Sequence, residues 1–438
     1  MRKTVRTMKK TMQRASQCAA VGVMGVGMAG VASAAPAGPT SQDEVRALVS
    51  EMLADADTRS SLLQSGSTAG HEKHFFLASP DGAFKLEIEG QIQFRYIANF
   101  REDGNRTRDD FESGFQTRRT KLSFQGEIYD NFFYKVKGAF SRKNGNFELE
   151  DSFFGYEFDN GMKIKAGQFK LPFLREELTS SSRQLAVDRS LTNEFFNQDF
   201  SQGVQLSMSR EKWRGSVAFS DGFKTRNTEF NDTTPGKSSD YAFTGRVEFL
   251  GSGNWKQFKD FTSPRGSEGV AWMLGAAAHY QDGPSSLVPT MLDGGSLISW
   301  TVDASVEGDG WSAYAAVIGR HTDNKFDIAG GGAGSADQYG LVAQGSYYLT
   351  DNFEPFVRWD ALVPDNGVVF NALTVGGNYY IHGHAAKFTV DAQWFLDAPA
   401  NTSFDGASGL GSEKGIGFLG SGGQENEFVL RAQFQLLF

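Results

Sequence analysis

The chain has 438 residues, a formal net charge of −9 at pH 7, and 38 Phe and 51 Gly beside only 11 Pro. After the first 34 residues there is no run of about 18 uncharged apolar residues, which excludes a membrane protein built from helical spans. A membrane-spanning β-barrel stays compatible with this composition, because its lipid-facing and lumen-facing residues alternate and aromatic residues gather at its interfaces.

The N-terminal segment has the features of a signal peptide. The sequence Ala32-Ser33-Ala34 is a small-x-small cleavage site that follows the apolar segment Cys18–Val31. Basic residues precede that segment at Arg2, Lys3, Arg6, Lys9, Lys10 and Arg14. We expect residues 1–34 to direct Sec export and to be removed with Cys18, the single cysteine. Their removal changes the formal net charge from −9 to about −15, and so acidic a protein is not expected to bind nucleic acid.

Residues 35–70 differ from the rest of the chain. Ser41-Gln42-Asp43-Glu44 is typical of a helix start, with acidic residues in the first turn. Apolar residues then recur at helical spacing, at Val45, Leu48, Val49, Met52 and Leu53. We expect a short periplasmic amphipathic helix within residues 41–64 and a linker over Ser65–His71. Two roles are open for the helix, oligomerisation or a partly ordered lead-in to the barrel, and we favour the second.

The period of the hydrophobic pattern changes from 3.6 to 2 at Phe84. From there to Phe100 apolar and polar residues alternate, so one face is apolar over about fifteen residues. Strands of soluble proteins usually run about 3–10 residues, whereas a tilted strand that crosses a bilayer and extends past it needs the greater length. This segment therefore predicts a transmembrane strand.

The same alternation predicts fifteen further strands. They lie at 117–128, 134–141, 147–158, 162–170, 202–210, 213–220, 240–250, 269–280, 297–307, 311–319, 338–349, 353–360, 368–381, 385–396 and 425–438. Short turns alternate with longer polar connections, as in outer-membrane barrels. Only the connection Gly251–Glu268 is long where a short turn is due. The expected fold is all-β, an antiparallel transmembrane barrel of about sixteen strands over residues 71–438.

The last predicted strand alternates to the end of the chain. Its apolar positions are Phe428, Leu430, Ala432, Phe434, Leu436 and Phe438. An alternating strand that ends in an aromatic residue resembles the terminal signal of bacterial outer-membrane proteins, which their barrel assembly machinery reads. We expect Phe438 to serve as this signal. The outer membrane is then the expected location, with its lipid and the assembly machinery as partners.

No arrangement of residues in the sequence predicts catalysis or a bound cofactor. His382-Gly383-His384 lies in a predicted tight turn with no carboxylate cluster nearby, and His71 and His74 lie in the linker. We interpret these histidines as solvated and expect no metal site. No Gly-x-Ser-x-Gly, Walker or dinucleotide motif occurs in a supporting strand–helix context. Neither an enzyme activity nor a cofactor is expected.

The polar face of the predicted strands is favourable only beside a water-filled lumen. Cationic candidates for the pore lining are Arg95, Arg119, Lys121, Lys135, Lys137, Lys163, Lys165, Arg246, Arg358, Lys387 and Arg431. Charged rings in a pore select ions of opposite sign, but cations can equally pair with carboxylates across strands and stabilise the wall.

The long connection Leu171–Ser201 carries Arg175, Arg183 and Arg189. We expect it to fold into the lumen as a constriction loop; an ordinary surface loop is the alternative.

Several segments resemble the phosphate-selective porin O and P family. The most specific is residues 164–173, Ile-Lys-Ala-Gly-Gln-Phe-Lys-Leu-Pro-Phe, with Glu176-Glu177-Leu178-Thr179-Ser180 and Asp188-Arg189-Ser190-Leu191 after it. Segments 353–360 and 373–380 are similar to later strands of the family. The resemblance spans about residues 84–438. It implies a sixteen-stranded homotrimeric porin with an inward-folded third loop and, in the best-known members, passage of phosphate along a ladder of arginines.

The sequence thus predicts an outer-membrane porin for passive diffusion of small hydrophilic solutes or ions, including anions such as phosphate. Phosphate selectivity is the least supported part, because a net charge near −15 and mixed lumen charges argue against a strongly cationic pore. Two other functions stay open. One is an outer-membrane barrel enzyme, which needs Ser, His and Asp near the barrel rim, and the other is a structural or adhesive barrel without an open pore.

Overall fold

The computed structural model describes Ser50 and residues 68–101, 111–230, 239–267, 269–283, 295–323, 335–365, 368–397, 416–419 and 427–438. The chain divides into two compact units, Met1–Gln64 and Ser65–Phe438, and every element named below belongs to the second. Apart from Ser50, the predicted signal peptide and the predicted helix within 41–64 lie outside the described residues. In the described part of the chain, no helix is long and apolar enough to cross a membrane.

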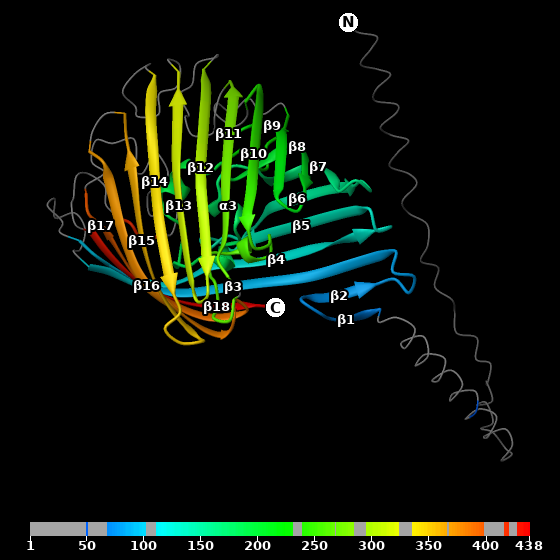
Figure 1. Ribbon diagram of the computed structural model, residues 1–438, viewed down its shortest axis with the longest axis horizontal. Coiled ribbons are helices and arrows are strands. Elements are labelled where there is room, and N and C mark those ends of the chain that lie inside the picture. Colours follow the sequence, from blue (N-terminus) through cyan, green and yellow to red (C-terminus); the bar gives the residue numbers. More distant parts are fainter. Residues whose placement is uncertain are drawn as a thin grey trace, which may run out of the picture. The chain divides into compact units, whose positions relative to one another are not determined.

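Sixteen antiparallel strands, β3 to β18, form a closed barrel (Figure 1). They are β3 Phe84–Phe100, β4 Phe111–Ile128, β5 Phe132–Phe140, β6 Phe147–Glu157, β7 Met162–Lys170, β8 Phe200–Ser209, β9 Trp213–Ser220, β10 Tyr241–Ser252, β11 Ala271–Asp282, β12 Ser296–Gly308, β13 Trp311–Thr322, β14 Ala336–Tyr347, β15 Phe353–Val363, β16 Phe370–His382, β17 Ala386–Phe395 and β18 Glu427–Leu437. Each pairs with the next along the chain, and β18 closes the ring by pairing with β3 from Phe428↔Phe100 to Leu437↔Gln91. The predicted fold class and strand number are confirmed.

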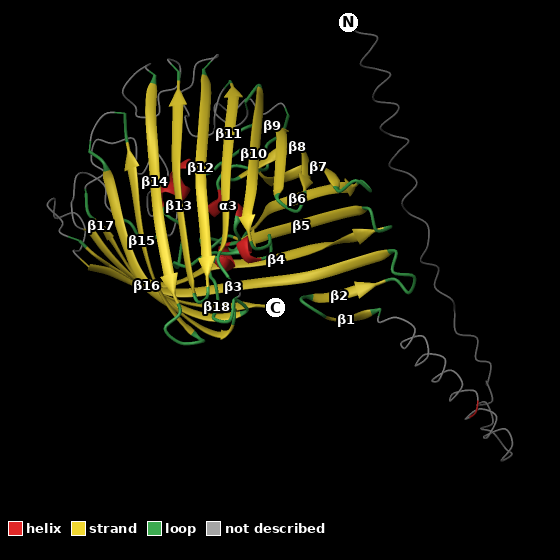
Figure 2. Ribbon diagram, viewed as in Figure 1, coloured by secondary structure: helices red, strands yellow, loops and turns green. Residues whose placement is uncertain are grey.

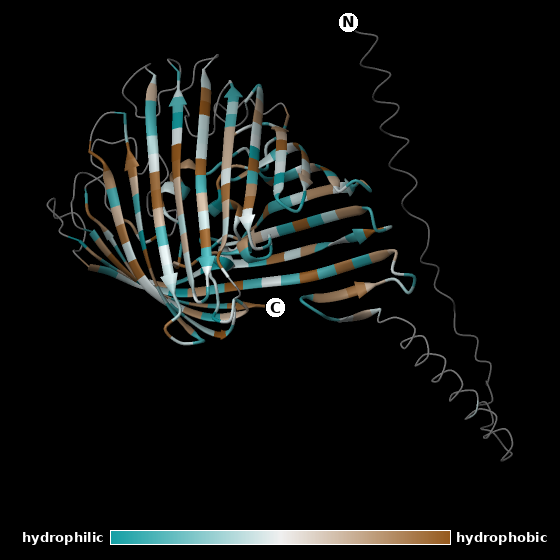
Figure 3. Cartoon of the chain, viewed as in Figure 1, coloured by the Kyte–Doolittle hydropathy of each residue, from teal (hydrophilic) through white to brown (hydrophobic). Residues whose placement is uncertain are grey.

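The two faces of each strand meet different environments. Along the strands, polar and apolar positions alternate in Figure 3. On β3, Phe94 is 46% exposed on the outside of the barrel, whereas its neighbours Gln93 and Arg95 are each 1% exposed. Apolar side chains on the outer face suit lipid, and polar side chains on the inner face find hydrogen-bond partners in the lumen. This division is the physical cause of the period of two in the sequence.

A short hairpin extends the wall beside β3. It consists of β1 Ala69–His71 and β2 Phe75–Ala78. β2 pairs with β3 over residues 85–88, while β18 pairs with residues 91–100 along the same edge of β3. The hairpin thus covers backbone groups of β3 that β18 leaves unpaired. Residues 69–71, which the sequence analysis assigns to a linker, are therefore a strand instead.

The C-terminal residue seals the junction between β18 and β3. The N–H of Gly90 donates to the carbonyl of Phe438 at 2.6 Å, and the N–H of Phe438 donates to the carbonyl of Gly90 at 3.1 Å. The Phe438 ring covers Gly90 so closely that a Cβ there would lie 2.2 Å from it. An aromatic ring placed over a glycine in this way fills the space that the missing side chain leaves.

Two connections fold into the interior of the barrel. The lumen loop, residues 171–199 between β7 and β8, contains α3 Arg175–Leu178, the 3-10 helix η1 Ser181–Arg183 and α4 Leu191–Phe196. The inner connection, residues 253–267 after β10, contains the 3-10 helix η2 Gln257–Lys259. In Figure 2 the helical segments lie within the ring of strands. Apolar residues of the lumen loop, such as Phe173 and Phe196, are 0% exposed and pack in a core with wall residues such as Phe370.

Candidate pore lining and inner loop

The tightest polar contact between the lumen loop and the wall centres on Asp188. Its carboxylate oxygens lie 2.5 Å from Arg95 Nη1, 2.9 Å from Arg119 Nη2 and 3.3 Å from Arg118 Nε. Burial raises the pKa of Asp188, but the surrounding guanidinium charges outweigh it and hold this pKa well below its usual value of 3.8. The carboxylate is therefore ionised, and it fixes the loop to β3 and β4.

Two adjacent arginines reach Asp188 because β4 contains a β-bulge. Gln93 on β3 pairs with Arg119, and the next residue of β3, Phe94, pairs with Thr117, so Arg118 is an extra residue on β4. A bulge interrupts the strict alternation of side chains. Alternation alone places Arg118 on the outer face, and for that reason the sequence analysis selected Arg119 and missed Arg118.

Other predicted pore-lining cations hold the backbone of the lumen loop. Arg358 Nη1 donates to the carbonyl of Asp188 at 2.9 Å, and Lys387 Nζ donates to the carbonyl of Gln184 at 2.8 Å. Arg189, predicted to face the lumen from the loop, turns back and donates to carbonyls of the loop itself, those of Glu176, Glu177 and Thr179. All three cations are buried. Together with Arg95 and Arg119 they position the loop instead of facing open space.

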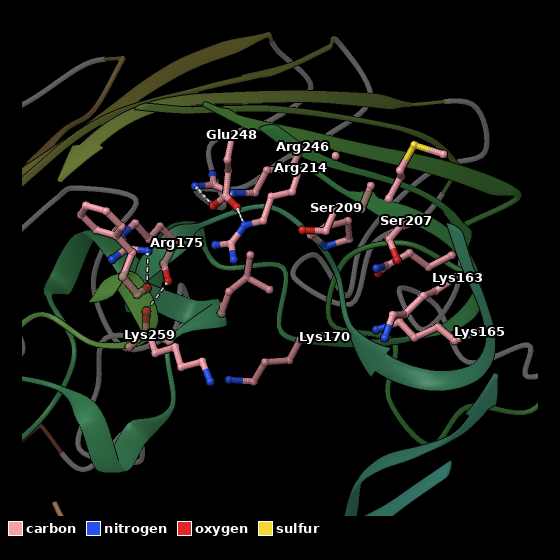
Figure 4. Close-up of a pocket in the computed structure, with 18 of the residues that line it drawn as sticks. Lys163, Lys165, Lys170, Arg175, Ser207, Ser209, Arg214, Arg246, Glu248 and Lys259 are labelled. Carbon is pink, nitrogen blue, oxygen red and sulfur yellow. Dashed lines mark hydrogen bonds and ion pairs between the residues drawn. The ribbon is translucent and has the colours of Figure 1, made fainter. Parts of the chain in front are cut away.

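A second set of cations lines a cavity of about 490 Å³ near the short turns of β7 and β8 (Figure 4). We call this cavity the cationic chamber. Its cationic residues are Lys163, Lys165, Lys170, Arg175, Arg214, Arg246 and Lys259. Among the lining residues, all of which are described, Glu248 is the only carboxylate. The side chains come from β7, β9, β10, the lumen loop and the inner connection, and in Figure 4 they surround a common space.

Four of the seven chamber cations have carboxylate partners. These pairs are Lys163 with Glu157, Lys170 with Glu177, Arg214 with Glu248, and Arg246 with both Glu248 and Asp303. Lys163 and Arg246, two of the predicted lumen cations, are thus paired with carboxylates of the wall. Four carboxylates for seven cations leave an excess of positive charge around the cavity.

The other three chamber cations, Lys165, Arg175 and Lys259, have no carboxylate within 4.0 Å among the described residues. The ammonium of Lys165 lies 4.1 Å from the centre of the Phe169 ring, a cation–π contact. Arg175 is buried on α3 and donates to Ser305 Oγ at 2.8 Å and to carbonyls of the inner connection. Lys259 is exposed on the inner connection. These side chains supply the uncompensated charge.

Four further predicted cations line two neighbouring cavities, whereas Arg431 is paired with Asp391 in the wall. Lys121, Lys135 and Lys137 face one of about 650 Å³, which Arg183 of η1 also borders. Glu150 binds both Lys121 and Lys137, at 2.5 Å and 3.0 Å. Arg183 also faces a second cavity of about 820 Å³, which Lys259 shares with the cationic chamber. The three cavities thus adjoin through common cationic residues.

The inner connection corrects the expectation for the turn His382–His384. The side chain of His384 is only 14% exposed, and its Nε2 lies 3.4 Å from Asp260 Oδ2. Burial raises the pKa of Asp260, but the hydrogen bond to His384 and the charge of Arg183 lower it below 3.8 overall. Arg183 Nη1 lies 3.3 Å from the same carboxylate. A carboxylate that is distant in sequence therefore holds the side chain of His384, which is largely buried, whereas His382 is exposed as expected.

Three chamber residues escaped the sequence analysis for different reasons. Arg214 shares the inward face of β9 with Ser216 and Ala218, so the alternation along that strand is enough to identify it. Lys170 ends β7, and alternation from Lys163 and Lys165 assigns it to the opposite face of the strand. Lys259 lies on the inner connection, which no strand period covers.

The sequence profile of one family, phosphate-selective porin O and P, matches residues 88–395. No curated protein sequence matches the chain. Among solved structures, the chain is similar to an anion-selective porin from Comamonas acidovorans, with TM-score 0.53, 11% identity, and coverage of 81% of this chain and 99% of that chain. It is similar to OmpF of Salmonella typhi in a complex with daunomycin, with TM-score 0.52, 12% identity, and coverage of 81% and 98%. At these identities the structural likeness establishes the barrel fold alone.

Proposed function

Because the chain belongs to the phosphate-selective porin O and P family, we propose that its pore prefers anions, with the cationic chamber as the region that sets the preference. The protein is a porin of the bacterial outer membrane, through which small hydrophilic solutes diffuse passively. Transport through such a pore needs no catalytic group, since the width and the charge of the lumen set the barrier.

The observation that carries the proposal is the excess of cations around the chamber. Lys165, Arg175 and Lys259 face it without a carboxylate partner in the described part of the chain. At an effective dielectric constant of about 20, a unit charge roughly 8 Å from a permeating anion lowers its energy by about 2 kcal/mol. The negative net charge of the whole chain does not oppose this preference, because the charges nearest the ion path decide selectivity.

The cationic residues of the wall and of the lumen loop have separate roles in this proposal. Arg183 and Arg175 of the loop, with Lys121, Lys135, Lys137, Lys163 and Lys165 of the wall, border the ion path. Arg95, Arg119, Arg189, Arg358 and Lys387 hold the loop that narrows it. The first group acts on permeating ions directly, and the second acts through the position of the loop.

Substitution of one chamber cation tests the proposal. We expect Lys165→Gln to reduce the preference for chloride over potassium in planar bilayers by at least about fivefold, because a unit charge roughly 8 Å away changes the energy of each ion by at least about 0.5 kcal/mol, with opposite sign for the anion and the cation. The matched control is Lys212→Gln, which removes the same charge from an exposed short turn and leaves selectivity unchanged. Equal selectivity of wild type and Lys165→Gln, or an equal loss in both variants, contradicts the assignment to the chamber.

We propose further that export and assembly follow the expectations from the sequence. Residues 1–34 are a Sec signal peptide, 41–64 an amphipathic helix in the periplasm, and Phe438 the signal for the barrel assembly machinery. Three copies form a homotrimer in outer-membrane lipid.

Mass spectrometry of the mature protein tests the cleavage after Ala34. Deletion of Phe438 is expected to lower the amount of folded barrel in the membrane. Chemical crosslinking in native membranes tests the trimer, and a monomer alone contradicts it.

A further inference from the structure

Three potential metal ligands converge beside the β1–β2 hairpin. His74 lies in the turn between the two strands, and Glu87 and Glu89 lie on β3. One ligand atom of each lies within 4.8 Å of those of the other two. His74 Nε2 is 3.0 Å from Glu89 Oε1. Within the described residues, no other group of three such side chains meets this spacing.

Strand register brings the three side chains together. Glu87 and Glu89 are two residues apart on β3, so both project to the same face. Phe75 of β2 pairs with Ile88 of β3, which places the preceding residue, His74, beside Glu89. The sequence indicates a solvated histidine in a linker, because the pairing of β2 with β3 leaves no local pattern that reveals it.

The two carboxylates lack full compensation from the protein. Lys85 Nζ lies 3.0 Å from Glu87 Oε1. The neutral amide of Gln125 donates to Glu87 Oε2 at 3.2 Å and to Glu89 Oε1 at 2.7 Å. Among the described residues, Lys85 is the one ammonium within 4.0 Å of either carboxylate, and its side chain is 34% exposed. Lys135 acts on Glu89 from a greater distance. A divalent cation in this position balances the remaining charge.

The ligand set has the chemistry of a site for a transition metal ion. One imidazole and two carboxylates are ligands of Zn²⁺ and related divalent ions. In tetrahedral Zn²⁺ sites the ligand atoms lie about 3.3 Å apart. Small side-chain rotations are enough to bring the ligand atoms of His74, Glu87 and Glu89, now within 4.8 Å of one another, to that distance. His74 borders both the 650 Å³ and the 820 Å³ cavity. Water from these cavities can therefore complete the coordination.

We propose that His74, Glu87 and Glu89 bind one divalent transition metal ion of the Zn²⁺ class, which fastens the β1–β2 hairpin to the barrel wall. The two strands have three and four residues, and a hairpin that short is weak when held by strand pairing alone. The ion adds a bond between the hairpin turn and β3. It also neutralises two negative charges at the edge of the cation-lined cavities.

Zn²⁺ titration of the full mature chain, folded in detergent, stripped with EDTA and carrying no histidine tag, tests this site. We expect calorimetry to show one equivalent of bound Zn²⁺, with affinity at least tenfold lower in His74→Ala and Glu89→Gln. The matched control is His71→Ala, which removes a histidine of the same hairpin that lies outside the cluster and retains the wild-type affinity. The heat-dependent migration of folded barrels in detergent gels checks that each variant is folded. If His74→Ala fails to fold, the Zn²⁺ affinity of Glu89→Gln decides whether the cluster binds the ion.

Hydrogen exchange provides a second measurement. Zn²⁺ is expected to slow exchange of the amides in residues 69–78 of the wild type but not in His74→Ala. An ordinary ion pair between His74 and Glu89 predicts instead that the wild type binds no stoichiometric Zn²⁺, and that result overturns the proposal. Equal affinity in wild type and His74→Ala, or an equal loss in His71→Ala, overturns it as well.

Discussion

Replacement of Asp188 by asparagine tests how the charge of this loop anchor affects ions that pass through the pore. Arg95, Arg118 and Arg119 all contact the carboxylate of Asp188, whose side chain is 0% exposed. Asp188→Asn keeps the size of the side chain but removes its charge. The three guanidinium groups stay protonated, since arginine does not lose its proton in proteins. The interior of the barrel therefore becomes more positive by one unit.

The magnitude follows from the position of the charge. At roughly 10 Å from a permeating ion, loss of one negative charge lowers the energy of an anion by about 0.4 kcal/mol in bulk water and by about 1.7 kcal/mol at an effective dielectric constant near 20. The energy of a cation rises by the same amount. We therefore expect the permeability ratio of chloride to potassium to increase at least about fourfold. Loss of the charge also removes the anion that Arg95 and Arg119 contact, and breaking a buried pair costs on the order of 3–5 kcal/mol of stability.

Reversal potentials of single channels in a KCl gradient provide the assay. The control is Asp159→Asn, which removes the same charge from an exposed short turn and is expected to behave as the wild type. Asp188→Glu, which keeps the charge, is expected to retain most of the wild-type selectivity. A reversal potential of Asp188→Asn equal to that of Asp159→Asn, or shifted toward potassium, refutes the reasoning.

Three further predictions concern the loop, the wall and the inner connection. Arg358→Met removes the donor to two carbonyls of the lumen loop and is expected to speed trypsin cleavage within that loop severalfold; an unchanged digestion rate contradicts its anchoring role. Gly167→Ala is expected to lower the free energy of unfolding in urea by about 2–4 kcal/mol, because this residue has φ +127° and a Cβ there would lie 2.2 Å from a carbonyl oxygen across the sheet. The control is Gly215→Ala, where the nearest atom to the added Cβ lies 3.6 Å away, and this variant is expected to change the free energy of unfolding little. Because the pKa of Asp260 is lowered in the folded state, its contribution to stability is complete above pH 3.8 and is lost as the pH falls through the lower folded pKa. His384→Ala is expected to raise this folded pKa, so that acid unfolding, followed by circular dichroism, begins at a higher pH. An unshifted onset of acid unfolding argues against the contact between His384 and Asp260.

The barrel was predictable from the sequence because a membrane imposes one simple rule on every strand. The period of two around Phe94 and Phe434, and the short turns between strands, follow from an apolar outer face and a polar inner face. The same rule failed at Arg118, where the bulge in β4 shifts alternation by one residue. It also missed β1, whose three residues are too few to show a period.

The candidate site was only partly predictable, because charge alone does not reveal the partner of a side chain. Arg95 and Lys165 look alike in the sequence as inward cations. In the structure Arg95 binds the loop carboxylate of Asp188, whereas Lys165 faces the cationic chamber. Lys259 lies on the inner connection, whose path into the lumen follows from tertiary packing of residues such as Phe261. Such contacts join distant parts of the chain and leave no local pattern.

The reversal potential of the wild-type channel in a planar bilayer with a KCl gradient tests the central claim most directly. An anion-preferring porin predicts stepwise conductance and a reversal potential displaced toward the chloride equilibrium potential. Displacement toward the potassium equilibrium potential contradicts the preference that we assign to the cationic chamber, and a folded barrel without conductance contradicts the open pore itself.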